Sequence, residues 1–106
     1  MLDRGNLIFI GSQLDISRPN WYRVYSDGWI EQGGLASVGT SGVTKLNINF
    51  HKQFNTSNIN VVATLTADTV TSDRCWGISR TFTKTYFTWI VAPASTADIS
   101  WMACGY

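Results

Sequence analysis

The stretch "NWYRVYSDGWIEQGG", residues 20–34, contains the strongest structural signals in the chain. Two short strand-like runs, 21–25 and 29–35, each begin with aromatic or β-branched residues, which favour β-strands. Asp27-Gly28 between them is typical of a type I′ turn, in which both central residues need positive φ. The stretch therefore predicts a β-hairpin, and Gly33-Gly34 in its second arm predicts a bulge or a close backbone approach.

The two arms of this hairpin carry opposite charges. Arg23 and Glu31 are about equally far from the turn, so they should face each other across the strands. A cross-strand ion pair of this kind contributes a few tenths of a kcal/mol to roughly 1 kcal/mol. The stretch as a whole thus indicates a structural role.

Similar β patterns continue to the end of the chain. Leu46, Ile48 and Phe50 alternate with polar residues, and apolar residues alternate in the same way within 59–66, 76–82, 87–91 and 99–103. No long window has apolar residues at helical spacing. About seven strands at intervals near ten residues predict an all-β fold, a small antiparallel β-sandwich of about six or seven strands.

Residues 1–19 differ from this pattern. They suggest an extended lead-in that contains the apolar segment "LIFI", residues 7–10, and closes at Pro19. With no hairpin partner nearby, residues 7–10 are expected to pack elsewhere, against neighbouring chains. Residues 20–106 form a single second unit, because no linker or internal repeat divides them.

Composition narrows the classes of partner. Only 14% of the 106 residues are charged, against roughly 25% in an average soluble domain. Hydroxyl and amide side chains replace them, which suits hydrogen bonding to sugars or packing against copies of the same chain. The net charge of +1 comes from scattered residues, so no nucleic-acid partner is expected. Without an apolar stretch of about 18 residues, no membrane insertion is expected.

No signal peptide is predicted either, because residues 7–10 are too short for its apolar region. We therefore expect that the protein leaves its cell by another route or that the sequence is an excerpt from a longer chain.

The sequence gives little support for a catalytic function. Asp27 and Glu31 could form a carboxylate pair as in glycosidases, but the turn already explains Asp27. Nucleophilic catalysis by Cys75 or Cys104 would need His51, the only histidine. His51 is expected to be a solvated loop residue, with a metal shared by three copies on a trimer axis as the alternative. We expect no enzyme, no cofactor and no metal; the two cysteines are either packed thiols or one disulfide.

The five tryptophans divide into two groups. Trp29, Trp76, Trp89 and Trp101 occupy in-pattern strand positions and are expected in the core or an interface. Trp21, with Tyr22, precedes the first clean strand and is more open to a surface role, such as stacking on a sugar, or to a contact between chains.

The hairpin motif "WYRVYSDGWIEQGG" and the terminal "WMACGY" resemble the C-terminal domain of bacteriophage tail fibre proteins. In that family W-Y-R-x-Y/W-S-D-G-W-x-E-Q-G-G precedes a small sandwich that ends in W-x-A-x-G-Y. The match covers about residues 20–106. From "LNINF" to the end, the layout is also similar to an H-type lectin, a six-stranded antiparallel sandwich that forms trimers.

The resemblance implies a homotrimer at the distal tip of a virion tail fibre, made in the host cytoplasm and released by lysis. Residues 1–19 would then be the end of the fibre shaft. The implied function is adhesion to a host receptor, either a lipopolysaccharide or capsular glycan or an outer-membrane protein. The alternatives are a structural trimerisation cap without receptor contact and a depolymerase that cuts the receptor glycan.

Receptor contacts are expected in loops that face away from residue 1, namely 51–58, 67–74 and 93–97. The chosen binding residues are Asp68, Asp73, Arg74 and Ser95. Arg74 falls where H-type lectins have a sugar-contacting arginine. Their sugar-stacking aromatic residue is replaced by Pro93 to Ser95.

Overall fold

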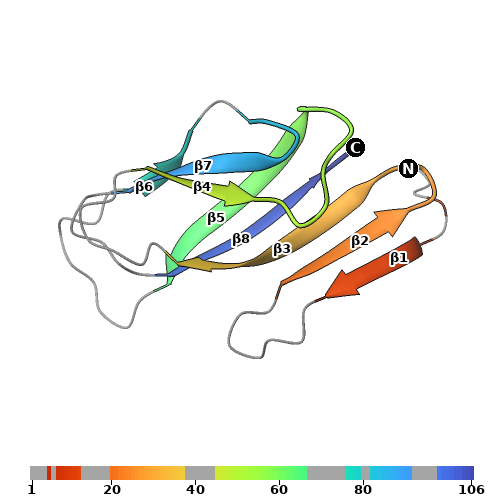
Figure 1. The fold of residues 1–106 in the computed structure, drawn as a ribbon, viewed down its shortest axis with the longest axis horizontal. Helices are drawn as coiled ribbons and strands as arrows, with labels where there is room; N and C mark the ends of the chain where they lie inside the picture. Colours follow the sequence, from red (N-terminus) through yellow and green to blue (C-terminus); the bar gives the residue numbers. More distant parts are fainter. Residues whose placement is uncertain are drawn as a thin grey trace.

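The computed structural model describes residues 5, 7–12, 20–37, 45–66, 76–79, 82–91 and 98–106. Their strands are β1 (Leu7–Ser12), β2 (Trp21–Tyr25), β3 (Ile30–Ser37), β4 (Lys45–Asn49), β5 (Ile59–Thr66), β6 (Trp76–Ile78), β7 (Tyr86–Val91) and β8 (Asp98–Gly105). They form a large sheet in the order β1-β2-β3-β8-β5 and a small sheet in the order β4-β7-β6 (Figure 1). Every described strand pairing is antiparallel, which confirms the predicted all-β fold.

No helix appears among the described residues, and none there could span a lipid bilayer.

The hairpin of the quoted stretch forms where the sequence predicts it, but its turn is of a different type. Gly28 N–H donates to the Tyr25 carbonyl at 2.9 Å, and Tyr25 N–H donates to the Trp29 carbonyl at 2.9 Å. Gly28 has a φ of 91°, whereas Asp27 has no positive φ, so the type I′ prediction is wrong. These features describe a type I turn followed by a left-handed glycine, the usual three-residue hairpin loop.

The Asp27 side chain explains this choice of turn. Its Oδ1 accepts a hydrogen bond of 3.0 Å from Trp29 N–H, two residues along the chain. This local Asx bond gives the Trp29 N–H a hydrogen-bond acceptor. In the shorter type I′ loop the same N–H would have a different acceptor.

β1 corrects the expectation that residues 7–10 lack a partner in their own chain. β1 pairs with β2 from Leu7 opposite Tyr25 to Ser12 opposite Trp21, with an irregularity between Leu7 and Phe9. Without β1, the backbone donors and acceptors along one side of β2 would be unpaired, and β1 provides their partners. That residues 1–19 also end a fibre shaft stays a prediction.

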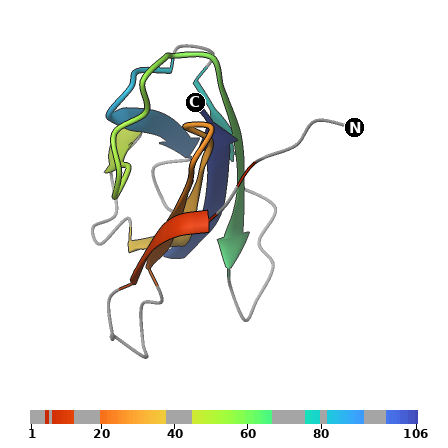
Figure 2. The same ribbon diagram turned by 90° about the vertical axis from the view of Figure 1, so that its right-hand side faces the viewer.

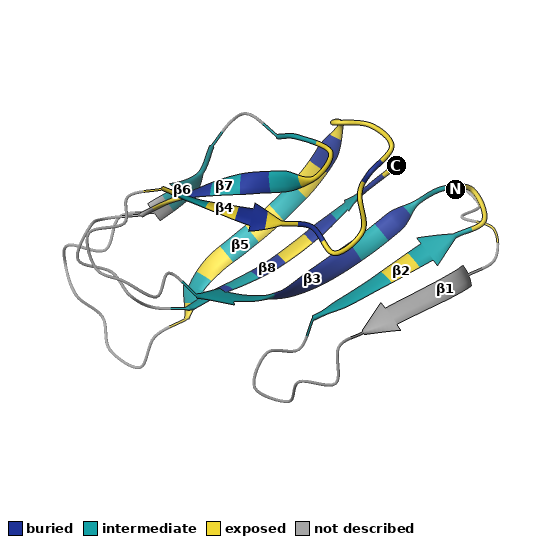
Figure 3. Cartoon of the chain, viewed as in Figure 1, coloured by how far each residue is buried: buried dark blue, intermediate teal, exposed yellow. Residues whose placement is uncertain are grey.

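The core lies between the two sheets, because the small sheet covers one face of the large sheet (Figure 2). The predicted alternation of inward and outward residues is confirmed in both sheets. Less exposed and more exposed residues alternate along β4 of the small sheet and along β5 and β8 of the large sheet (Figure 3). The buried apolar residues are Ile30, Ile48, Phe50, Phe54, Ile59, Phe87, Trp89, Ile99, Trp101 and Ala103. Removing this apolar surface from water is the main stabilising contribution to the fold.

The segment between β4 and β5, predicted as a polar loop, also contributes to the core. Phe54 is fully buried and meets Phe50 edge-to-face, with ring centroids 4.9 Å apart. Phe54 N–H donates to the Lys84 carbonyl at 2.9 Å, and Asn55 and Thr56 N–H donate to the Tyr106 carbonyl at 2.8 and 2.9 Å. The loop is therefore bonded to the residues before β7 and to the end of β8, and it closes one end of the sandwich.

Candidate ligand-binding groove and signature hairpin

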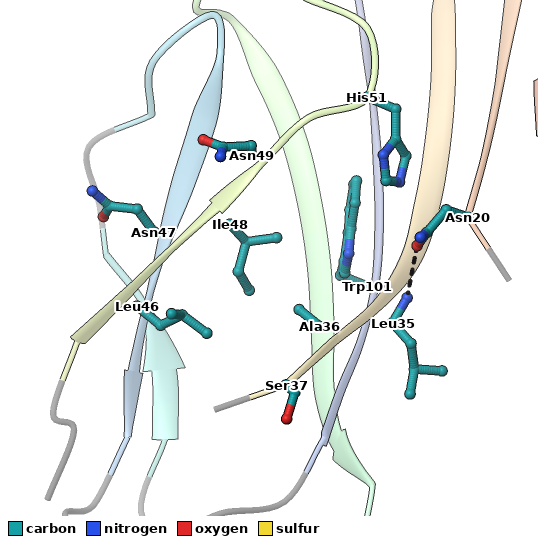
Figure 4. A pocket seen from close by; sticks show the side chains of 10 residues that line it. All are labelled: Asn20, Leu35, Ala36, Ser37, Leu46, Asn47, Ile48, Asn49, His51 and Trp101. Carbon is teal, nitrogen blue, oxygen red and sulfur yellow. Dashed lines mark hydrogen bonds between the residues drawn. The ribbon is translucent and has the colours of Figure 1, made fainter. Parts of the chain in front are cut away.

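A groove of about 230 Å³ opens between β3 of the large sheet and β4 of the small sheet (Figure 4). β4 residues lie on one side of the groove, Asn20 and His51 lie on the other, and Trp101 lies between them. The lining residues are Asn20, Leu35, Ala36, Ser37, Leu46, Asn47, Ile48, Asn49, His51 and Trp101. β4 is an edge strand, so backbone groups on its unpaired side add hydrogen-bonding capacity to this region.

The groove contains an aromatic residue but no open aromatic face. Trp101 is only 5% exposed, and the His51 ring lies against it at a centroid distance of 5.2 Å. A sugar stacking on an aromatic ring needs that ring to be uncovered. Stacking of a sugar on Trp101 is therefore blocked, and the polar groups of the groove are those of Asn20, Ser37, Asn47, Asn49 and His51.

Gly34 makes the polar side of the groove possible. A Cβ at this position would fall on Asn20 Oδ1 and lie 3.2 Å from His51 Nε2. With no side chain there, Asn20 Oδ1 can accept a hydrogen bond from Leu35 N–H at 3.4 Å. The close approach predicted for Gly33-Gly34 is confirmed, and no bulge interrupts the registers of β3.

His51 is exposed, as expected of a loop histidine, but its ring is held in place. Nε2 lies 3.1 Å from the Gly33 carbonyl, which can only accept, so Nε2 carries the proton. Partial burial lowers the pKa of His51 below its usual range, and the bond to Gly33 opposes that shift. Burial therefore favours the neutral ring over the imidazolium. A metal shared on a trimer axis stays a prediction; with this bond intact it would have to use Nδ1.

Gln32 is a buried polar residue that the sequence reasoning missed. Its Oε1 accepts from His51 N–H at 2.8 Å and from Lys52 N–H at 3.0 Å, and its Nε2 donates to the Lys52 carbonyl at 2.8 Å. The signal was present: Gln32 occupies an inward position of β3 between Ile30 and Gly34. A polar residue at such a position must be hydrogen-bonded inside the fold.

Outside the groove, the charged and aromatic side chains of the hairpin formed by β2 and β3 contact one another. Arg23 pairs with Glu31 in register, with Nη1 and Oε2 3.9 Å apart, which confirms the predicted ion pair. Glu31 also accepts from Trp29 Nε1 at 3.3 Å. Trp21 has the Arg23 guanidinium 4.9 Å from its ring centroid, and its Nε1 would lie 3.1 Å from a Cβ placed on Gly33. With both of these neighbours so near, Trp21 is poorly placed to stack on a sugar.

The terminal motif "WMACGY", residues 101–106, also contacts this hairpin. The Tyr106 ring meets Trp29 edge-to-face at 5.2 Å, and Tyr106 Oη donates to Asp27 Oδ2 at 3.3 Å. Residues at the two ends of the 20–106 unit therefore hold one another, which supports the structural role expected of the hairpin. Of the tryptophans expected in the core, Trp89 and Trp101 are buried and Trp29 is half-buried. The side chain of Trp76 lies outside the described residues.

The predicted receptor-binding residues Asp68, Asp73, Arg74 and Ser95 all lie outside the described residues. The described residues that flank these segments in the sequence are Thr66, which pairs with Asp98, and Trp76, which pairs with Val91. The pair of Thr66 and Asp98 lies at the end of the sandwich opposite the one where Ile59 pairs with Gly105.

Residue 1 lies outside the described residues, so whether the loop 51–58 faces away from it stays a prediction; the loop can be placed relative to Gly5. A Cβ on Gly5 would contact Ser26 Oγ, Tyr106 Oη bonds Asp27, and Asn55 bonds the Tyr106 carbonyl. The loop thus lies at the same end as Gly5. The backbone of the loop is hydrogen-bonded to Gln32, to the residues before β7 and to Tyr106. These bonds hold the loop at this end of the sandwich.

Cys104 is half-buried on β8, and Cys75 lies outside the described residues, so their pairing stays an open prediction. The part of the chain that the structure describes contains no group of three or more His, Cys, Asp or Glu side chains able to hold a metal.

Comparison with known proteins gives matches of structure only. No family model and no curated protein matches the sequence. An N-truncated R2-type pyocin tail fibre superposes with a TM-score of 0.69 at 22% identity, covering 93% of this chain and 38% of that one. A C-terminal fragment of the Pseudomonas aeruginosa R2 pyocin fibre gives the same TM-score, identity and coverage of this chain, with 26% of its own length covered.

An N-truncated R1-type pyocin tail fibre gives a TM-score of 0.62 at 17% identity, with 93% of this chain and 87% of that chain covered. The chain thus spans well under half of the two R2 fibre chains. The similarity to H-type lectins stays a prediction. The resemblance to phage tail fibres, first suggested by the two motifs, is confirmed for the fold: this chain has a β-sandwich-like fold that R-type pyocin tail fibres also contain.

Proposed function

We propose that this chain is the receptor-binding tip of a phage-type tail fibre, acting as a homotrimer at the distal end of the virion. Its target would be a host surface glycan, lipopolysaccharide or capsule, or an outer-membrane protein. One observation carries the proposal: 93% of the chain superposes on the R2 pyocin tail fibre with a TM-score of 0.69. Residues 1–19 would continue into the fibre shaft.

The described strands suit the role of a rigid scaffold. The charged pair of the hairpin, the Gln32 amide and much of the backbone of the loop 51–58 bond within the chain, which leaves these groups poorly placed for a receptor. Binding residues are commonly found on loops that a rigid scaffold positions. Asp68, Asp73, Arg74 and Ser95 belong to segments that connect strands, and their side chains have the donors and acceptors that sugar hydroxyls require. We retain them as the proposed contacts.

We propose binding rather than cleavage. Glycosidases need two carboxylates on either side of the scissile bond. Among the described residues, Asp27 is bonded to Trp29 and Tyr106, and Glu31 is bonded to Arg23 and Trp29. Release of sugar from purified host polysaccharide would contradict this part of the proposal.

A structural trimerisation cap is the second candidate. It is favoured by exposed apolar side chains on the outside of the large sheet, Val62 at 72% and Met102 at 47%. Binding of the isolated protein to host cells would favour the adhesion function over a cap without receptor contact.

The test is binding of fluorescently labelled protein to a panel of Gram-negative strains, including P. aeruginosa, with stepwise truncated surface polysaccharides. The double variant Asp73→Ala/Arg74→Ala should bind the recognised strain at least roughly tenfold more weakly, the loss expected for one charge-assisted hydrogen bond. Its trimer mass should not change.

Lys52→Ala/Asn55→Ala is the matched control, since both side chains are exposed on the loop near Gly5. It should bind like the unchanged protein. Equal binding by both double variants would rule out Asp73 and Arg74 as contacts. Absence of binding to every strain would overturn the adhesion function.

A further inference from the structure

The outer face of the large sheet, opposite the small sheet, carries an apolar row that no described element covers (Figure 2). The strand registers place Trp21 beside Gly33, Gly33 beside Met102, and Met102 beside Val62. We call these four residues the outer row. Val62 is 72% exposed and Met102 is 47% exposed, so an apolar surface there faces solvent in the single chain.

The surroundings of the outer row contain few charges. The other outward residues of β5 and β8 are Asn60, Thr64, Thr66, Ser100 and Cys104, all uncharged, and Asp98 at the end of β8. On β3 the charge is Glu31, which is paired with Arg23. Depletion of charge around an apolar centre, with Met and Trp present, is the composition of the core of a protein interface.

No described strand pairs with the outer edge of β5 in the large sheet. β5 is the end strand of the large sheet and runs for eight residues, Ile59–Thr66. It contains no charged residue and no proline, and its register with β8 has no bulge. Natural sheets protect an exposed edge with such features or cover it. β5 is therefore expected to be covered in the assembled protein.

We propose that the outer row and the adjoining β5 edge are the surface on which a second copy of this chain packs. A copy is the occupant that the chemistry favours. Among the described residues, the charges near the row are the paired Arg23 and Glu31 and also Asp98, so this face can pack against a neighbouring copy around a threefold axis with little repulsion. A nucleic acid would need a basic surface. A glycan could bond the flanking Asn60, Thr64 and Ser100, but it would not remove the apolar side chains of Val62 and Met102 from water as an apolar protein surface does.

This assignment rests on the homotrimer of the proposed function and names the surface that forms it. It concerns assembly and not receptor contact, so the two can fail separately. If association does not depend on the outer row, adhesion through Asp73 and Arg74 is still tested by cell binding.

Molar mass by light scattering and native mass spectrometry tests the proposal, using Val62→Lys and the matched control Ile90→Lys. Ile90 is also an exposed aliphatic residue in a strand, 40% exposed, but it lies on β7 of the small sheet. We expect the unchanged protein and Ile90→Lys to be trimers, and Val62→Lys to be monomeric at the same concentration. Circular dichroism melting checks that both variants are folded.

Met102→Gln is a milder variant that keeps the side-chain length without adding charge. It should weaken association roughly tenfold, because it removes part of the apolar area buried in the interface. If Val62→Lys does not fold, the association of Met102→Gln tests the proposal in its place. The proposal is overturned if Val62→Lys or Met102→Gln folds and associates like the unchanged protein, if Ile90→Lys dissociates equally, or if the unchanged protein is a monomer.

Discussion

At the scale of single residues, Gln32 organises the described site more than any charged side chain. It is fully buried, and its amide bonds the backbone of both His51 and Lys52. Through these bonds the start of the loop 51–58 is fixed to β3, and the His51 ring is positioned against Trp101 and the Gly33 carbonyl. One side chain therefore links the large sheet to the loop that closes the sandwich.

Replacing Gln32 by alanine should lower the free energy of unfolding by about 1–3 kcal/mol, because three hydrogen bonds are lost and their backbone partners are only partly reached by water. Chemical denaturation measures this change. Gln53→Ala is the matched control: Gln53 is exposed on the same loop, and its loss should change stability by no more than about 0.5 kcal/mol. Equal effects of the two substitutions would contradict the role given to Gln32.

At the scale of elements, the spacing between β2, β3 and β8 depends on a glycine. A Cβ on Gly33 would lie 2.7 Å from the backbone carbonyl oxygen of Trp101 and 3.1 Å from Trp21 Nε1. The carbonyl belongs to the neighbouring strand and cannot rotate away as a side chain could. The glycine is required here for space and not for its φ, since positive φ among the described glycines occurs at Gly5 and Gly28.

Gly33→Ala should therefore destabilise the fold by about 1–3 kcal/mol, the cost of overpacking. Gly77 in β6 offers the contrast, because a Cβ there has no atom within 4 Å. Gly77→Ala should be neutral or stabilise by up to about 1 kcal/mol, since glycine is unfavourable within a strand. Thermal and urea unfolding of both variants measure the difference. A neutral Gly33→Ala would show that the strands can separate at no cost.

At the scale of the whole molecule, the described sandwich separates two regions. One end gathers the hairpin turn, the loop 51–58 and Tyr106, which are joined by hydrogen bonds, and Gly5 lies beside Ser26 of the turn. The other end has the paired strand ends Thr66 and Asp98, from which the segments containing the proposed receptor contacts continue. The outer row lies on a third surface, so assembly and adhesion do not compete for the same residues.

This separation predicts that assembly controls the strength of cell binding. Linked weak sites gain about 10²–10⁴ in avidity over a single site. Monomeric Val62→Lys should therefore bind the recognised strain at least roughly a hundredfold more weakly than trimeric Ile90→Lys, although both keep Asp73 and Arg74. Titration of labelled protein on cells measures the apparent affinity. A monomer that binds as tightly as the trimer would show that one site is sufficient.

The amino-acid sequence by itself determined most of the strands and the face that β4, β5, β7 and β8 bury, whereas the strand expected across 76–82 ends at Ile78. Ile48, Phe87, Trp89, Ile99 and Trp101 are buried at the positions that alternation predicts. The hairpin and the Arg23–Glu31 pair also follow from neighbouring residues. Alternation and turn residues act over a few positions, so local sequence is sufficient for these features.

Only the tertiary structure decided which strands meet. The pairing of β1 with β2, the position of β8 between β3 and β5, and the burial of Phe54 in a polar loop depend on hydrogen bonds and packing between distant segments. The groove has the same origin, since β3 and β4 supply its walls and β8 its Trp101. Local periodicity fixes the face of a strand but not its partner, which is chosen by the backbone groups and apolar surface that remain to be covered.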